Sequence, residues 1–308
     1  MSQDKKGNIA HSISQRLLNR AKANKEDFNF LLSRYGMERF LYRISISPHA
    51  DRLILKGASL FLVWAGQNHR VSRDVDFLGF GNPDADQLAE IFLDVCCIES
   101  PDDGMIYLCD SLKTEAICEG QEYDGVRITL VGLLDRARIP LQFDIGFGDI
   151  VTPAPENVEY PVLLDYPPPL LRAYPRYTLV AEKTEAMVRL GLANSRLKDF
   201  YDIWLVSRLF SFEGSILQKA LQNTFERRRT ALPESIPFAF TPAFYDDAQK
   251  RIQWTAFVKK SKPSIPIYDL TTIITDISDF LVPVVKGLLL NDPFECTWLP
   301  DHGWSGES

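Results

Sequence analysis

The stretch RVSRDVDFLGF, from Arg70 to Phe80, places two aspartates, Asp74 and Asp76, two residues apart within an apolar run. Alternate side chains of a β-strand share one face, so both carboxylates would point the same way, opposite Val75 and Phe77. Two neighbouring carboxylates repel each other, and burying either one without a partner is costly. A divalent cation offsets both effects. The pattern therefore leaves two interpretations, a solvated strand face or a metal site.

A third acid, Asp144, occurs in the later run LQFDIGFGD, between Phe143 and Ile145. If this run is a strand beside the first, the three carboxylates converge on one point. That arrangement holds Mg²⁺ ions about 4 Å apart for phosphoryl or nucleotidyl transfer. Asp149, five residues later, is an alternative third ligand, in which case Asp144 would cap a turn. We favour Asp144 because it lies within the β-run, whereas Asp149 follows two glycines.

Upstream, LKGASLFLVW predicts a strand, a turn at Gly57 and the start of a helix. Gly57 would let backbone N–H groups approach a phosphate, and the N-terminus of the helix would favour its negative charge. Ser59 could donate a hydrogen bond to the same group. Turns of this kind are common, so the motif gains its meaning from the Asp-x-Asp strand that follows it.

The remaining patterns predict an α/β protein with a small mixed sheet and a helical C-terminal domain. Residues 1–50 are expected to form a helical lead-in, with Ile13 to about Tyr42 helical, and residues 51–165 the α/β core. The prolines of YPVLLDYPPPLLRAYPRY interrupt regular structure, which places a boundary there. Residues 166–308 would form the helical domain.

Composition sets further bounds. The 308 residues are 45% hydrophobic and 24% charged, as in an ordinary globular protein. The net charge of −7 argues against non-specific coating of nucleic acid but leaves room for a local basic groove. The five cysteines and four histidines show no zinc-ligand spacing. The N-terminus lacks the apolar core of a signal peptide, and FLVPVVKGLLL is too short to span a bilayer. We therefore expect a cytoplasmic protein without membrane association.

The order Gly-small-Ser, then an Asp-x-Asp strand, then a later strand acid resembles the nucleotidyltransferase superfamily typified by polymerase β. More narrowly, ERFLYRISISPHADRLILKGASLFLVWAG and RVSRDVDFLG are similar to the AbiEii/AbiGii toxin family. These proteins are the toxin halves of type IV toxin–antitoxin and abortive-infection pairs. YTLVAEKTEAMVRLGLANSRLKDFYDIWLV matches the family's Glu-Lys helix and its Arg-x-Lys-Asp-x-x-Asp helix. The resemblance covers about Glu38 to Leu205. It departs at Ala58, where many members have a second glycine.

The resemblance implies a role for each matching residue. The nucleotide triphosphate and its surrounding loop would be held by residues at and after the turn: Gly57, Ala58, Ser59, Arg70 and Ser72. Metal would bind to the strand acids Asp74, Asp76 and Asp144. The catalytic group would comprise Asp74, Asp76, Lys183, Asp199 and Asp202. Within it, Lys183 would contact phosphate or assist the leaving group, and either Asp199 or Asp202 would complete the site.

The implied reaction is a transfer of a nucleoside monophosphate from an NTP co-substrate to an acceptor, with Mg²⁺ or Mn²⁺ as cofactor. The implied acceptor is RNA, in particular the tRNA 3′ end. The implied partner is a cognate antitoxin, which in a type IV pair need not bind the toxin directly. Two alternatives stay open: a protein or small-molecule acceptor, as in antibiotic adenylyltransferases, and a non-catalytic nucleotide-binding interaction protein.

Several residues also have plain structural interpretations. The structural interpretation of Lys183 is an ordinary helix-surface lysine, and that of Asp199 with Asp202 is a solvated acidic patch. Glu185 and Arg189 are spaced for an i,i+4 ion pair. The basic run from Arg227 to Arg229 is interpreted as a solvated helix end in preference to an RNA contact.

Overall fold

The computed structural model describes residues 3–66, 74–81, 84–100, 102–118, 124–261, 265 and 268–306. The chain forms two compact units, and each is described by itself. The sheet unit comprises the described residues up to Gly148 together with Asn157–Ala173. The helical unit comprises Asp149–Glu156 and the described residues from Tyr174 onward.

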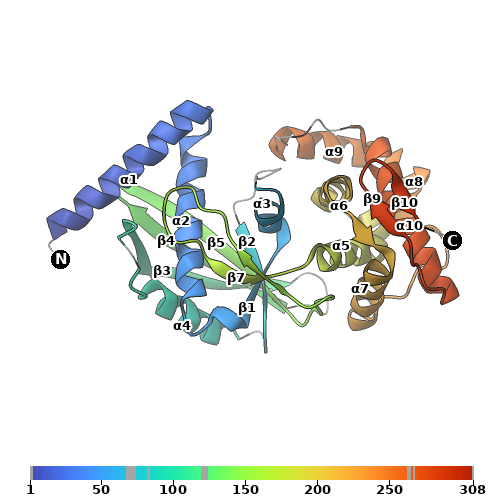
Figure 1. The fold of residues 1–308 in the computed structure, drawn as a ribbon, viewed down its shortest axis with the longest axis horizontal. Helices are drawn as coiled ribbons and strands as arrows, with labels where there is room; N and C mark the ends of the chain where they lie inside the picture. Colours follow the sequence, from blue (N-terminus) through green and yellow to red (C-terminus); the bar gives the residue numbers. More distant parts are fainter. Residues whose placement is uncertain are drawn as a thin grey trace. The chain divides into compact units, whose positions relative to one another are not determined.

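The sheet unit is built on a seven-stranded mixed sheet in the order β3-β4-β5-β2-β1-β7-β6 (Figure 1). Its strands are β1 (Leu53–Lys56), β2 (Asp74–Gly79), β3 (Met105–Cys118), β4 (Asp124–Leu134), β5 (Ala137–Phe147), β6 (Glu156–Glu159) and β7 (Leu170–Ala173). β2 runs parallel to β5 and β1 runs parallel to β7. The pairs β1–β2, β3–β4 and β4–β5 are antiparallel. The prediction of an α/β fold with a mixed sheet is confirmed.

The hairpin of β4 and β5 follows directly from the sequence. Leu134 pairs with Ala137, so only two residues form the turn, and Asp135 adopts a left-handed φ of 53°. Short polar side chains tolerate this conformation better than most. From Ile139 to Phe147 of β5 the odd-numbered residues are buried and the even-numbered ones are not, which is the alternation expected of a sheet with two different faces.

The α-helices in the described part of the sheet unit are α1 (Gln3–Asn24), α2 (Phe28–Ser45), α3 (Leu60–Ala65) and α4 (Ala85–Cys96). The predicted single helix from Ile13 to Tyr42 is in fact two, because the chain turns at Lys25 (φ 56°) and Asp27 caps α2 by accepting a hydrogen bond from the Phe30 N–H. The break contains no proline or glycine, so helical periodicity alone does not reveal it.

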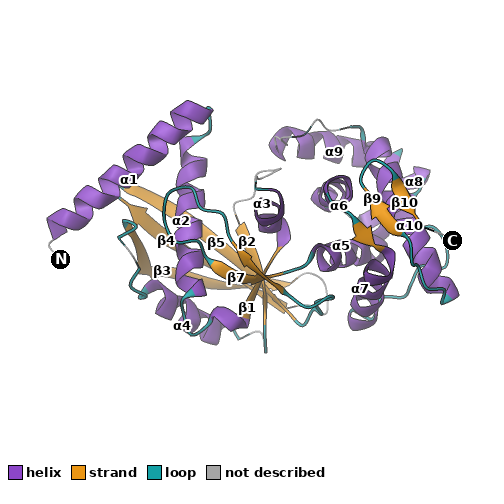
Figure 2. Ribbon diagram, in the orientation of Figure 1, coloured by secondary structure: helices purple, strands orange, loops and turns teal. Residues whose placement is uncertain are grey.

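The helices α2 and α4 pack on one face of the sheet (Figure 2), and an aromatic cluster joins them to it. Phe40 of α2 lies 5.5 Å from Phe92 of α4 and 4.9 Å from Phe143 of β5, measured between ring centroids. Phe77 of β2 stacks on Phe143 at 6.4 Å. All four rings are buried. Burial of such large side chains stabilises the unit and fixes which face of β2 and β5 points inward.

The helical unit contains α5 (Arg176–Leu190), α6 (Leu197–Leu209), α7 (Gly214–Arg227), α8 (Pro242–Tyr245), α9 (Ala248–Ser261) and α10 (Leu270–Leu290). It also contains a small sheet that the sequence patterns did not predict, with β8 (Phe212–Glu213), β9 (Thr297–Leu299) and β10 (Gly303–Ser305) in the order β10-β9-β8. Trp298 packs on Phe280 at 4.9 Å and donates a hydrogen bond to the Ser207 carbonyl at 2.7 Å. None of the described helices is long and apolar enough to cross a membrane.

A buried acid, Glu38 of α2, ties the helix to the loop before β7. Its side chain is fully buried and accepts hydrogen bonds from the Leu163 N–H, at 3.0 Å to Oε2. Burial raises the pKa of Glu38 to about 8, although Arg39 and Arg34 favour the charged form. The carboxyl group is therefore largely protonated at neutral pH.

Glu38 makes the stability of the fold depend on pH. Its pKa is raised from 4.5 when the chain folds, so the folded state binds more protons between pH 4.5 and about 8. The contribution is fully present below pH 4.5 and is lost as the pH rises towards 8. We predict that Glu38→Gln reduces the loss of stability with rising pH, measured as the free energy of unfolding from pH 4.5 to 8.5. The exposed Glu90→Gln is the matched control, and equal pH profiles for the two variants would contradict the prediction.

Candidate active site

The structure brings Asp74, Asp76 and Asp144 together. Because β2 and β5 are adjacent parallel strands, Asp76 pairs with Asp144 and Asp74 pairs with Gln142. One carboxylate oxygen from each of the three acids lies within 4.8 Å of the other two. All three side chains are half-buried. The arrangement offers three anionic oxygens to one position, as a hard divalent cation requires.

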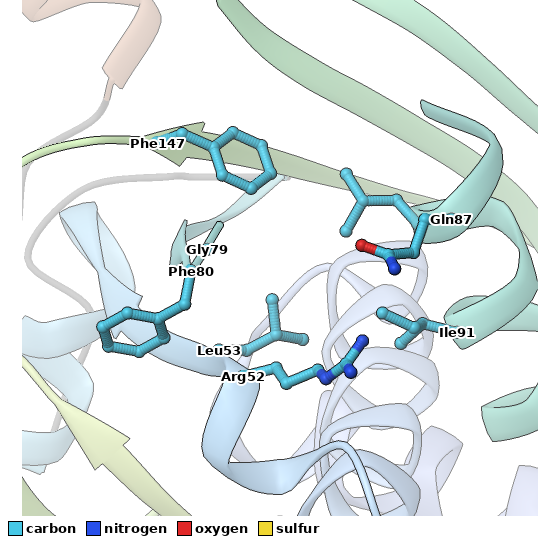
Figure 3. A pocket seen from close by; sticks show the side chains of 8 residues that line it. Arg52, Leu53, Gly79, Phe80, Gln87, Ile91 and Phe147 are labelled. Atoms are coloured by element: carbon cyan, nitrogen blue, oxygen red, sulfur yellow. The ribbon is translucent and has the colours of Figure 1, made fainter. Parts of the chain in front are cut away.

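The acids lie on the face opposite the aromatic cluster. Val75 and Phe77, which alternate with them, are 3% and 0% exposed on the inner face. A pocket opens on that inner side of the sheet, where Gly79 and Phe147 meet Ile91 of α4 (Figure 3). The sheet itself therefore separates this pocket from the carboxylates.

Gly57 is required by the close approach of the turn to Asp76. Lys56, the last residue of β1, pairs with Asp76, and the next residue, Gly57, has a φ of +73°. A Cβ atom at Gly57 would lie 1.9 Å from Oδ2 of Asp76. Both the backbone conformation and the lack of space therefore favour glycine. A single turn of 3₁₀-helix, Gly57–Ser59, then leads into α3.

Two further residues of the predicted nucleotide loop are buried. Ala58 is 9% exposed and Ser59 is 8% exposed. Ser59 lies beside Tyr160, a residue whose pKa burial raises to about 12. Arg70 and Ser72 lie outside the described residues.

A row of charged residues crosses four strands at the acids. Arg127 of β4 pairs with Asp144 of β5, which pairs with Asp76 of β2, which pairs with Lys56 of β1. The Arg127 guanidinium donates from Nε to Oδ1 and from Nη2 to Oδ2 of Asp144, both at 2.8 Å. Gln142 Nε2 also lies 3.3 Å from Oδ1 of Asp144. Sequence reasoning missed Arg127, Gln142 and Lys56; a lone arginine in the apolar run DGVRITLVGLL was the available signal.

In the helical unit, Lys183 of α5 is held by both acids of α6. Its ammonium group makes a short contact with Asp199 and lies 3.0 Å from Oδ2 of Asp202. Arg196 Nε lies 2.9 Å from Asp199 Oδ2. Burial would raise the pKa of Asp199, but the charges of Lys183 and Arg196 outweigh it, so the pKa lies below its usual value. The two carboxylates are 1% exposed, so they are not a solvated patch. The Lys183 side chain is 13% exposed, so it is not an ordinary helix-surface lysine.

A second buried ion network surrounds Arg228. Its guanidinium binds Asp149 at 2.9 and 3.0 Å and Glu185 at 2.7 Å. The interpretation of the basic run as a solvated helix end is therefore wrong for Arg228, whose side chain is only 21% exposed, because three carboxylates from other segments surround it. Asp149 thus pairs with Arg228 in the helical unit. The predicted ion pair of Glu185 with Arg189 is confirmed at 3.0 Å.

A mixed sheet that carries three clustered carboxylates is compatible with a nucleotidyltransferase, and comparison with protein families shows that the chain belongs to this class. A family model described as nucleotidyl transferase AbiEii toxin, type IV TA system, matches residues 39–276. The chain belongs to this AbiEii family of nucleotidyltransferase toxins. This bears out the resemblance seen in its motifs.

Two solved structures share part of the architecture. They are a "putative nucleotidyltransferase from H. pylori" and JHP933 from Helicobacter pylori, each 14% identical with a TM-score of 0.48. Each alignment covers 85% of this chain, with 97% of the first structure and 94% of the second. A likeness this distant carries no statement about function. Among curated proteins, none matches the chain.

The contact between Gly57 and Asp76 gives a matched pair of glycine variants. Gly57→Ala and Gly66→Ala both place a side chain at positive φ, which costs about 1 kcal/mol. Among the described residues, only Gly57→Ala also meets a neighbour, because none of them lies within 4 Å of a Cβ at Gly66. We predict that Gly57→Ala lowers the free energy of unfolding by about 1–3 kcal/mol more than Gly66→Ala, as overpacking does. Equal losses in denaturant titrations would refute the close approach.

Lys183 has a structural role that can be measured apart from catalysis. Removing one partner of a buried ion group leaves uncompensated charge and costs about 3–5 kcal/mol. We predict a loss of this size for Lys183→Met at pH 7, measured by chemical denaturation. Lys198→Met, at an exposed position of α6, should change stability by less than about 0.5 kcal/mol. A Lys183→Met protein as stable as the wild type would show that the group is not a structural unit.

Proposed function

We propose that this nucleotidyltransferase transfers a nucleoside monophosphate from an NTP to RNA, with a divalent metal held by Asp74, Asp76 and Asp144. The observation that carries the proposal is the convergence of these three carboxylates, within 4.8 Å of one another, in a chain of the AbiEii family. The tRNA 3′ end is the acceptor that the resemblance implies.

The donor set suits Mg²⁺ or Mn²⁺. All three groups are carboxylates, and hard oxygen donors are the ligands that these ions prefer, whereas zinc favours histidine and cysteine. The glycine at Gly57 supports the same proposal, because it leaves Asp76 the room that a Cβ atom would occupy. When bound, the metal would activate the acceptor hydroxyl and stabilise the charge on the phosphates.

The reaction itself is a displacement at the α-phosphorus. The acceptor oxygen bonds to this phosphorus while the bond to the β-phosphate oxygen breaks, and pyrophosphate leaves. The turn at Gly57–Ser59 presents backbone next to Asp76, the strand acid paired with Lys56. We propose that this turn binds the triphosphate of the nucleotide, as the resemblance implies.

For Lys183 we keep the implied role of contacting a phosphate or assisting the leaving group. Within the helical unit its ammonium group is held by Asp199 and by Asp202. Both acids would then act as positioning residues that keep Lys183 charged and fixed in place. The sequence left open whether Asp199 or Asp202 completes the site; in this proposal both acids hold Lys183.

Membership of a type IV toxin–antitoxin family implies an antitoxin partner. We propose that the pair acts in the cytoplasm, where modified RNA would block translation, and that the antitoxin need not bind the toxin. A protein or small-molecule acceptor is the second candidate. The net charge of −7 favours it, because a polyanion such as RNA is repelled at long range.

A labelling experiment tests the proposal. The full chain is incubated with Mg²⁺ or Mn²⁺, total RNA and each α-labelled nucleoside triphosphate in turn. We predict label in tRNA-sized RNA with the wild type, and a loss of at least about 10²-fold in Asp76→Asn, because electrostatic stabilisation of the transition state is removed. Asp110→Asn, at an exposed position of β3, is the matched control and should label like the wild type.

The outcomes separate the candidates. Label that enters protein or a small molecule and still depends on Asp76 would replace the RNA acceptor while keeping the metal site. Label that survives Asp76→Asn unchanged would reject the carboxylate site. Omitting the divalent ion and adding a chelator should abolish transfer in the wild type.

A further inference from the structure

The third strand acid, Asp144, already has a cationic partner. Arg127 occupies both of its oxygens through two hydrogen bonds of 2.8 Å, the bidentate geometry that makes an arginine–carboxylate pair strong. Gln142 adds a third donor at 3.3 Å. The proposed function makes the same two oxygens available to a metal.

These two uses of Asp144 compete through charge. A carboxylate has about four lone-pair positions; Arg127 takes two of them and Gln142 a third, so a cation can still reach the remaining one. That cation would lie close to a guanidinium group carrying the same sign of charge, and like charges at short range repel. Asp74 also attracts the Arg127 guanidinium, so Arg127 interacts with two of the three acids. Metal binding to the protein alone is thereby weakened.

A triphosphate removes the conflict. Phosphate oxygens offer arginine the same bidentate acceptors as a carboxylate does. Arg127 is the member of the pair that can turn away, since its side chain is 37% exposed and that of Asp144 is 18% exposed. A guanidinium that moves from Asp144 to a phosphate frees the carboxylate for the metal and binds the nucleotide in the same step.

We propose that Arg127 is a positioning residue that couples metal binding to nucleotide binding. Without nucleotide it neutralises Asp144 and keeps metal affinity low; with nucleotide it pairs with a phosphate and the metal binds tightly. This inference rests on the proposed function, since it takes Asp144 as a metal ligand. The alternative is a purely structural cross-strand ion pair between β4 and β5, which would leave metal affinity unchanged or would lower it when broken.

The test measures Mn²⁺ affinity of the full chain by calorimetry, first alone and then with inorganic tripolyphosphate, a probe that does not depend on the base. We expect Arg127→Gln to bind Mn²⁺ alone about 10-fold more tightly than the wild type. We also expect the increase in Mn²⁺ affinity that tripolyphosphate causes to be about 10-fold smaller in this variant, since coupling between two ligands is reciprocal. Arg127→Lys keeps the charge and should retain weak Mn²⁺ binding.

Arg138→Gln is the matched control. It removes one positive charge from the same face of β5, six residues or about 20 Å from Asp144, at an exposed position. It should leave both affinities unchanged. Thermal unfolding of each variant, followed in parallel, establishes that the compared proteins are folded.

Two results would overturn the inference. If Arg127→Gln binds Mn²⁺ alone no more tightly than the wild type, while Asp76→Asn abolishes binding, the metal site stands and the coupling role of Arg127 fails. If no Mn²⁺ binds to the wild type or to Arg127→Gln, even with tripolyphosphate, both the inference and the proposed metal site fail.

Discussion

The parallel pairing of β2 with β5 is the constraint on which the candidate site depends. It sets Asp76 beside Asp144, and a slip of one residue would turn one of the two carboxylates to the opposite face. The register is held from the other side of the sheet, where Phe77 and Phe143 pack with the aromatic residues of α2 and α4. The apolar core beneath the sheet therefore determines the geometry of the polar groups above it.

The same register extends outward to both neighbouring strands. β1 brings Lys56 and then Gly57 against Asp76, and β4 brings Arg127 against Asp144. Two acids at the centre of the row are thus flanked by two basic residues. This charge order offsets the repulsion between the neighbouring carboxylates in the folded chain.

The helical unit shows the same principle in its interior. Lys183 with Asp199 and Asp202, and Arg228 with Asp149, Glu182 and Glu185, are buried groups in which each charge has a partner. Buried ion groups are weak evidence for added stability but strongly restrict how the helices can pack. The first group joins α5 to α6, and the second joins the end of α7 to α5.

The sequence by itself determined the α/β class, the alternation that puts Asp74 and Asp76 on one face, the turn at Gly57 and the family, because these depend on residues that are close in the chain. Tertiary structure decided the remainder. Only the register of β5 on β2 places Asp144 beside the two acids, and only tertiary packing pairs Asp149, in the segment after β5, with Arg228.

The same distinction applies to the contacts that the sequence analysis did not predict. Arg127 becomes part of the site through the β4–β5 hairpin, and Asp199 and Asp202 are both drawn to Lys183 by the packing of α6 on α5. The small sheet of β8, β9 and β10 joins segments about 80 residues apart. Local periodicity in the sequence indicates which face of a strand or helix a residue occupies. The partner of that residue depends on how distant segments pair, and local sequence patterns do not determine that pairing.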